Sequence, residues 1–103
     1  MIISFRHKGL ALFFKTGKMS GIQSIHATRL RELLTALNVA KAPGDLNRPS
    51  WRLHSLLGSK LGYHSLTVHT NWRLTFRFVG QDLEMLDYLD YHLGNDDENA
   101  QSC

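Results

Sequence analysis

Cysteine and long apolar runs are nearly absent from this sequence. Cys103 is the single cysteine, which excludes an internal disulfide framework and a zinc site built from several cysteines. No apolar run approaches the roughly 20 residues that a membrane-spanning helix needs. The first residues, MIISFRHKG, lack the apolar segment of a secretion signal. We therefore expect a cytoplasmic protein that does not contact a membrane.

Common enzyme motifs are missing as well. The sequence has no glycine-rich phosphate loop, no nucleophile elbow and no helical HExxH. Six histidines suggest a metal site, but His64 and His69 differ by an odd number of positions and would face opposite sides of one strand. No histidine pair has the spacing of zinc ligands. We predict no bound metal and no cofactor.

Length and charge set the broad class. The 103 residues suffice for one domain with one hydrophobic core. The net charge is +3, but three of the nine acidic residues, Asp96, Asp97 and Glu98, lie in the final segment. The remaining residues carry twelve basic side chains against six acidic ones. This surplus attracts polyanions, although a solvated lysine-rich surface would have the same composition.

The stretch from Gly62 to His92 holds most of the aromatic, β-branched and histidine residues and predicts the core of a sheet. In Trp72 to Phe78 apolar and polar residues alternate, so Arg73 and Arg77 share the open face of a half-buried strand.

The connection to the preceding strand follows from the apolar faces. Leu66 and Val68 share a side with Leu74 only if three residues, 69–71, join the strands, with Asn71 in the left-handed position.

Further strands and two helices complete the predicted fold. Met1 to Phe5 and Trp51 to Leu56 read as strands, the latter with Arg52 and His54 on the open face. The last strand, Leu83 to His92, has apolar residues of both parities, which leaves its inward face undetermined.

Two helices are predicted in the first half. One contains Leu10 and Phe13 and stops at Gly17. The other follows a capping box at residues 20–23. Its apolar stripe consists of Ile22, Ile25, Leu30, Leu33, Leu34 and Leu37. We expect an α/β domain of the α+β type, in which two N-terminal helices pack on one face of a mainly antiparallel sheet of about five strands. This domain spans residues 1–92, and residues 93–103 form an acidic tail expected to be disordered.

The end of the last predicted strand holds a candidate site. Asp90, Tyr91 and His92 place a carboxylate, a phenol and an imidazole side by side. The tripeptide alone could also be an ordinary polar strand terminus. The prediction of a site is stronger because His54 and Arg73 are expected on the open face. RNA cleavage by its own 2′-hydroxyl needs a base, an acid and a cation, and these residues could supply them.

Three segments of the sequence resemble the HigB-type toxins of the RelE superfamily. They are NRPSWRLHSLLG, GYHSLTVHTNWRLTFRF and LDYLDYH, and the similarity extends over residues 1–92. The resemblance implies a RelE-like fold and the toxin of a type II toxin–antitoxin system. The implied activity is metal-independent cleavage of mRNA in the ribosomal A site. The implied partners are a HigA-type antitoxin with a helix-turn-helix, the ribosome and mRNA, with operator DNA bound only through the antitoxin.

The same resemblance assigns the catalytic residues. They are His54, Arg73, Asp90, Tyr91 and His92. Arg73 would clamp the phosphate and stabilise the transition state. His54 and His92 would transfer protons, in an order that is not assigned. Asp90 would orient a histidine or act as base, and Tyr91 would position or stack on the substrate.

RNA contacts are expected from Arg52, Lys60 and Arg77. Some relatives carry a lysine at the position of Leu57, so Lys60 or Arg77 would have to supply that cation here. Other basic side chains would hold ribosomal RNA through salt-sensitive phosphate contacts. They are Arg6, Lys8, Lys15, Lys18, Arg29 and Arg31.

Two other functions fit the sequence. A RelE-like module without catalysis could block the ribosome or only bind an antitoxin. A DNA-binding module could act through the basic face, but we find no recognition helix.

Overall fold

The computed structural model describes residues 1–91. His92 and the predicted tail, 93–103, lie outside the described residues. Its helices and strands follow one another along the chain as α1 (Lys8–Thr16), η1 (Ser24–His26), α2 (Ala27–Val39), η2 (Pro43–Leu46), η3 (Pro49–Trp51), β1 (His54–Ser55), η4 (Gly58–Lys60), β2 (His64–His69), β3 (Trp72–Val79) and β4 (Asp82–Asp90). Within residues 1–91, no helix has the length and apolar composition of a membrane span.

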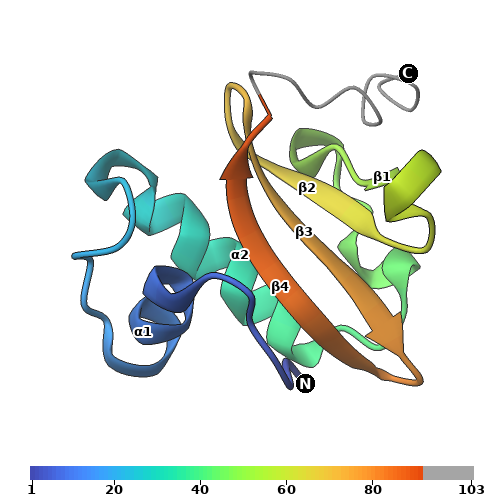
Figure 1. Cartoon of the computed structure of the whole chain (residues 1–103), viewed down its shortest axis with the longest axis horizontal. Coiled ribbons are helices and arrows are strands. Elements are labelled where there is room, and N and C mark those ends of the chain that lie inside the picture. Colours follow the sequence, from blue (N-terminus) through green and yellow to red (C-terminus); the bar gives the residue numbers. More distant parts are fainter. Residues whose placement is uncertain (92–103) are drawn as a thin grey trace.

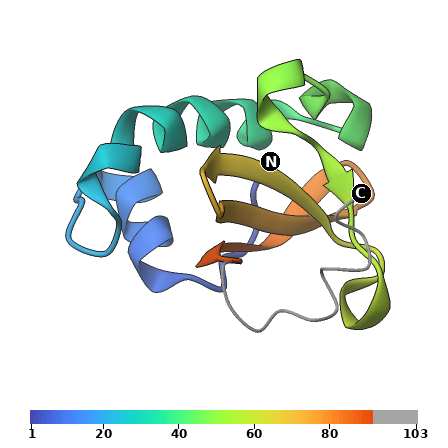
Figure 2. The same cartoon turned by 90° about the horizontal axis from the view of Figure 1, so that it is seen from above.

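One antiparallel sheet organises the molecule, with the strands in the order β1-β2-β3-β4 (Figure 1). The α2 helix covers one face of this sheet, and η4 lies on the other side (Figure 2). The prediction of two helices on about five strands is therefore corrected to one main helix, α2, on four strands. The shorter α1 lies beside the sheet. Met1 to Phe5 contributes two isolated parallel bridges, Ile2 to Leu83 and Phe5 to Leu86, in place of a fifth strand.

The core forms between α2 and the sheet. The predicted helix stripe is correct at four buried leucines, which are Leu30, Leu33, Leu34 and Leu37. It is wrong at Ile25, which is 76% exposed because it precedes the helix.

The predicted capping box at residues 20–23 is also wrong. The α2 helix begins at Ala27 after a single 3-10 turn, and Gln23 makes no side-chain cap. Instead, the backbone N–H of Gln23 donates to the hydroxyl of Tyr88 (3.2 Å), 65 positions away. A tertiary hydrogen bond therefore replaces the local cap.

The α1 helix follows the prediction more closely. His7 caps its start, because its Nδ1 accepts from the N–H of Leu10 (3.0 Å). Gly17 ends it at φ 83°, and the N–H of Gly17 donates to the carbonyl of Phe13 (2.9 Å).

The β2–β3 hairpin has the predicted register in its body and a different turn. Leu66 pairs with Leu74 as expected. However, His69 pairs with Trp72, so the connection has two residues, and Thr70 rather than Asn71 takes the positive φ (48°). The register shifts by one between Thr67 and His69. A bulge thus produces the alignment of apolar residues for which a three-residue loop was predicted.

A second bulge fixes the inward face of β4. Met85 has φ 58°, and the register with β3 shifts there. The shift changes the parity of the strand, so Leu83, Leu86 and Tyr88 are all buried. The N–H of Met85 donates to Ser4 Oγ (2.8 Å), so the N-terminal segment supplies a partner for the bulged backbone.

The predicted strand Trp51 to Leu56 shrinks to β1. Pro49 opens a 3-10 turn that includes Trp51, and Arg52 takes a left-handed conformation (φ 50°). Only His54 and Ser55 pair with β2.

Candidate active site

The face of the sheet opposite α2 carries His54 and Arg73, two of the predicted catalytic residues, and we call it the catalytic face. It is defined by cross-strand pairs, whose side chains lie on one side of a sheet. One row of partners joins His54 to Ser65, Ser65 to Thr75 and Thr75 to Asp87. The next row joins Thr67 to Arg73 and Arg73 to Leu89. The predicted placement of His54, Arg73 and Arg77 on one face is therefore confirmed.

Arg73 is held at the start of β3. Its Nη1 donates to the carbonyls of Thr70 (2.5 Å) and Trp72 (3.2 Å). Burial lowers the pKa of its guanidinium, whereas nearby Tyr91 raises this pKa and Arg52 lowers it. Tyr91 and Arg52 are therefore within electrostatic range of Arg73. Arginine remains charged throughout the physiological range, so the face contains a fixed cation.

The end of β4 is hydrogen-bonded to the β2–β3 turn, which also holds Arg73. Asp90 pairs with Trp72, and the N–H of Tyr91 donates to the carbonyl of Asn71 (3.0 Å). Strand alternation puts Tyr91 on the side of Leu89 and Arg73, and Asp90 on the side of Trp72, toward α2. Tyr91 thus joins Arg73 on the catalytic face, while Asp90 is exposed at its edge.

His54 stands on the edge strand β1, half-buried. Strand β2 separates it from β3, and the β2 partners of His54 and Arg73 are two residues apart, so about 12 Å lies between the backbones that carry them. Ser65 and Thr67, both with small side chains, occupy β2 between them. The two longer side chains therefore flank a low floor, which suits a phosphodiester reached from both sides.

The centre of the catalytic face is less open than expected. Ser65 and Thr75 are only 3% and 1% exposed. The hydroxyls of Thr67 and Thr75 are buried and have no hydrogen-bond partner in the described part of the chain. The expectation of an open face is therefore wrong at the centre and holds at the rim, where Arg52 and Arg77 are exposed.

The three predicted RNA contacts lie in separate elements. Arg52 is in the turn before β1, close enough to Arg73 to lower the pKa of that guanidinium. Lys60 and Arg77 meet at the ring of Tyr63, with Lys60 Nζ 5.6 Å and Arg77 Cζ 5.5 Å from its centroid. Arg77 Nε also donates to Glu84 Oε2 (2.6 Å), and this hydrogen bond raises the pKa of Arg77.

The comparisons with known proteins identify the family. A family model described as the RelE-like toxin of the type II toxin–antitoxin system HigB matches residues 3–92. This chain belongs to that HigB-like family. The Endoribonuclease HigB of Proteus vulgaris is 46% identical over 92 residues, which are 89% of this chain and all of that relative. As a HigB-like toxin, the chain is the half of a type II system that pairs with an antitoxin.

A solved structure supports the fold of this HigB-like chain. The crystal structure of a YafQ mutant from E. coli matches with a TM-score of 0.55 and 21% identity. The match covers 87% of this chain and 91% of that one. At this identity the likeness shows the fold alone.

A buried cluster next to the candidate site was not predicted from the sequence. His26 is 2% exposed, and its Nδ1 lies 2.6 Å from the Tyr88 hydroxyl. That hydroxyl also accepts from the backbone N–H of Gln23, so it joins the start of the η1–α2 segment to the His26 imidazole. Burial, and then His69, lower the pKa of His26.

The cluster supports the beginning of β3. The Trp72 ring packs 4.7 Å from Tyr88 and 5.5 Å from His26, measured between centroids. Trp72 precedes Arg73 and pairs with Asp90, so the cluster fixes the backbone on which the site is built. No sequence signal paired His26 with Tyr88, because the face of β4 depends on the Met85 bulge.

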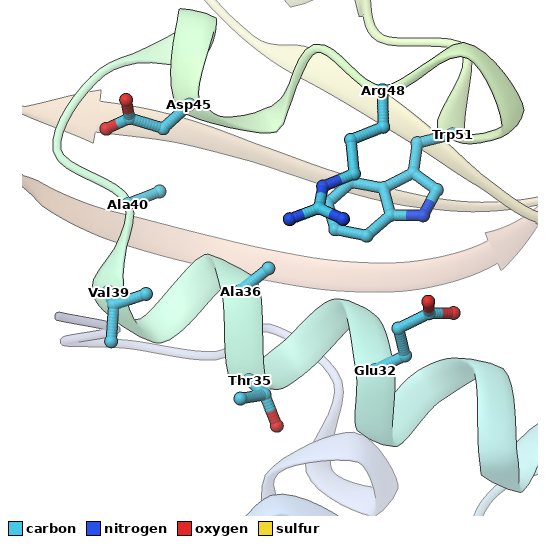
Figure 3. Close-up of a pocket in the computed structure, with 8 residues that line it drawn as sticks. All are labelled: Glu32, Thr35, Ala36, Val39, Ala40, Asp45, Arg48 and Trp51. Carbon is cyan, nitrogen blue, oxygen red and sulfur yellow. The ribbon is translucent and has the colours of Figure 1, made fainter.

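Two other features bear on the site. Within residues 1–91, no three His, Cys, Asp or Glu side chains are grouped to hold a metal ion. A hollow of about 380 Å³ lies on the α2 side, between that helix and residues 43–51. In it the Arg48 guanidinium stacks on Trp51, with Cζ 4.9 Å from the ring centroid (Figure 3). Its lining contains no histidine, so it does not belong to the proton-transfer site.

Proposed function

We propose that this HigB-like toxin is a ribosome-dependent mRNA endonuclease, which cuts mRNA in the ribosomal A site and so inhibits translation in the cytoplasm. The 46% identity to an endoribonuclease supports the class of reaction. The carrying observation is that the start of β3, which holds Arg73, pairs with the end of β4, which Tyr91 follows, and that His54 lies on the same face as Arg73.

The proposed chemistry is transfer of the phosphodiester to the adjacent 2′-hydroxyl. A base removes the 2′-hydroxyl proton, and the oxygen attacks phosphorus. The 5′-oxygen then leaves and takes a proton from an acid. The products are a 2′,3′-cyclic phosphate and a 5′-hydroxyl. The proposed scheme uses neither a metal ion nor a cofactor.

Each predicted residue has a role in this scheme. Arg73 stabilises the extra negative charge of the phosphorane. Its guanidinium is held in position because Nη1 donates to the turn carbonyls. His54 and His92 transfer the protons, in an order that we leave open. Asp90 lies on the α2 side of the last strand position, so it would reach the reaction around the end of β4, where we propose that it orients one of the two histidines or serves as base. Tyr91 positions the substrate.

The proposed partners follow the family. They are a HigA-type antitoxin with a helix-turn-helix, the 30S A site and mRNA, and operator DNA is contacted through the antitoxin. Arg52, Lys60 and Arg77 contact RNA at the rim of the catalytic face.

The test is to add the purified toxin to a translating extract and to map the mRNA ends. The expected result is new 5′-hydroxyl ends within codons in the A site. The matched control is His92→Ala, which should leave the messages intact. Intact messages in the presence of wild-type toxin and active ribosomes would refute the proposal.

A toxin that binds without cutting is the second candidate. The observation that favours it is that Leu57, the position at which the family resemblance leads us to expect a lysine, is an uncharged side chain that is 45% exposed. The buried centre of the catalytic face points the same way. Growth inhibition that persists in His92→Ala without mRNA cleavage would select this candidate.

A further inference from the structure

Tyr63 is an aromatic residue of the catalytic face that takes no part in the proposed cleavage reaction. It has the parity of Ser65 and Thr67, and its ring meets Arg77, which is on the same face as Arg73 and Thr75. Its backbone is held on both sides. The N–H donates to the carbonyl of Lys60 (2.9 Å), and the carbonyl accepts from the N–H of Leu56 (2.9 Å). The backbone that carries this half-buried ring is therefore fixed.

Two cations from different elements converge on this ring. Lys60 comes from η4, on the side of the sheet away from α2 (Figure 2), and Arg77 comes from β3. Glu84 accepts only the Nε–H of Arg77, one of the five donors of a guanidinium. With one carboxylate against two cations, the cluster keeps a positive charge. Both cations lie over the ring, and a phosphate that bound them would draw them off it and free a ring face for a base. Cations combined with an aromatic ring are typical of sites that bind single-stranded nucleic acid.

We propose that Lys60, Tyr63 and Arg77 bind a second nucleotide of the RNA, outside the scissile bond. Its phosphate lies between the ammonium and the guanidinium, and its base packs against the Tyr63 ring. We call this the Tyr63 site. The inference rests on the proposed function, because it takes the bound polymer to be the RNA cut beside Arg73.

The spacing along β3 separates the two sites. Arg73 and Arg77 are four residues apart on one strand, which corresponds to about 13 Å. The Arg73 guanidinium is held by the carbonyls at the β2–β3 turn, whereas the Arg77 guanidinium is held by Glu84 and the Tyr63 ring, so Arg77 serves a different nucleotide. The buried side chains of Ser65 and Thr75 lie between the sites. The RNA backbone would therefore run along β3, from Arg73 toward Arg77.

An ordinary structural role is the competing explanation. Cross-strand contacts between a cation and an aromatic ring stabilise sheets without any ligand. Arg48 over Trp51 is a cation–ring contact within the η3 turn, on the α2 side of the molecule (Figure 3) and away from the catalytic face. It provides the matched control.

The first experiment measures binding of the full chain to a short single-stranded RNA. The RNA carries 2′-O-methyl groups, which prevent cleavage, and one 2-aminopurine, whose fluorescence falls on stacking. Tyr63→Ala should weaken binding about tenfold and remove the quenching, whereas Tyr63→Phe should keep both. Lys60→Ala should lower the salt dependence by about one phosphate contact. Arg48→Ala should bind like the wild type.

The second experiment repeats the mRNA mapping in the translating extract. Tyr63→Ala should need more toxin for half-maximal cleavage and reach the same maximal rate, because the site binds RNA away from the reacting bond. Wild-type behaviour of Tyr63→Ala in both experiments overturns the Tyr63 site and leaves the nuclease standing. Equal losses in Tyr63→Ala and Arg48→Ala also overturn it.

The two proposals can fail separately. If wild-type toxin cuts no message, the nuclease proposal fails, and the RNA titration still decides whether Tyr63 stacks on a base. If Tyr63→Ala does not fold, Tyr63→Phe and Lys60→Ala decide. Loss of quenching in Tyr63→Phe, or an unchanged salt dependence in Lys60→Ala, overturns the site.

Discussion

Gly9 in α1 and Gly21 in the segment before η1 contact each other through their backbones. A Cβ on Gly9 would lie 2.6 Å from the Gly21 carbonyl oxygen, and a Cβ on Gly21 would lie 2.5 Å from Gly9 Cα. Real Cβ atoms do not approach backbone so closely, so the two segments must separate if either glycine gains a side chain. This contact places α1 beside the start of the η1–α2 unit.

We therefore expect Gly21→Ala to lower the free energy of unfolding by about 1–3 kcal/mol, the usual cost of overpacking. Urea titration followed by circular dichroism measures it. Gly44→Ala is the control, because nothing lies within 4 Å of a Cβ there. Equal midpoints for the two variants would contradict the close contact.

The buried His26 makes stability depend on pH. Burial and His69 lower its pKa below the ordinary value of 6.5, so the unfolded chain binds this proton more readily than the folded one. The stabilisation is complete above pH 6.5 and is lost as the pH falls below it toward the folded-state pKa. The surrounding groups are the Tyr88 hydroxyl, His69 and the Trp72 ring.

We expect the urea midpoint to fall between pH 7 and pH 5, and His26→Gln to reduce this fall. The full titration of one such proton changes stability by up to about 1.4 kcal/mol per pH unit. Burial also lowers the pKa of His64, so His64→Gln should reduce the remaining fall. An unaltered pH profile in His26→Gln would show that His26 is not the sensitive group.

For Thr75 we predict a substitution that raises the stability of the fold. Its hydroxyl is buried in the sheet and has no hydrogen-bond partner within residues 1–91. Replacement by an apolar group of similar shape removes the cost of burying that hydroxyl. Thr75→Val should therefore raise the free energy of unfolding by about 1 kcal/mol. In Thr35→Val, the control, the exposed hydroxyl that donates to the Arg31 carbonyl is lost, and no gain is expected.

The catalytic face was predictable where side-chain alternation alone decides it. The pattern of β3 put Arg73 and Arg77 on one side, and the parity of His54 added it to them. The position of Asp90 was not predictable, because the Met85 bulge changes the parity of β4. That bulge uses Ser4, 81 positions away, as a hydrogen-bond partner.

The turns and helix starts failed for the same physical reason. The start of α2 depends on the Tyr88 hydroxyl and on the Gly9–Gly21 contact, and neither can be read from residues 20–23. Local patterns therefore predicted which residues share a face, while distant contacts determined where elements begin and bend.

The last prediction concerns Arg73 itself. A lysine at this position keeps the charge but loses the planar fork that bonds the turn carbonyls and would clamp the phosphate. We expect Arg73→Lys and Arg73→Ala to lower the rate of mRNA cleavage by about 10²–10³-fold, the usual cost of losing transition-state stabilisation. Mapping of mRNA ends over time in the translating extract measures this rate.

Arg48→Ala should cleave at the wild-type rate, and urea titration should show that each Arg73 variant remains folded. Cleavage by a folded Arg73→Ala at the wild-type rate would remove the phosphate clamp from the scheme. Tyr91 acts electrostatically on the same guanidinium. Its proposed role in positioning the substrate would then have to depend on a residue other than Arg73.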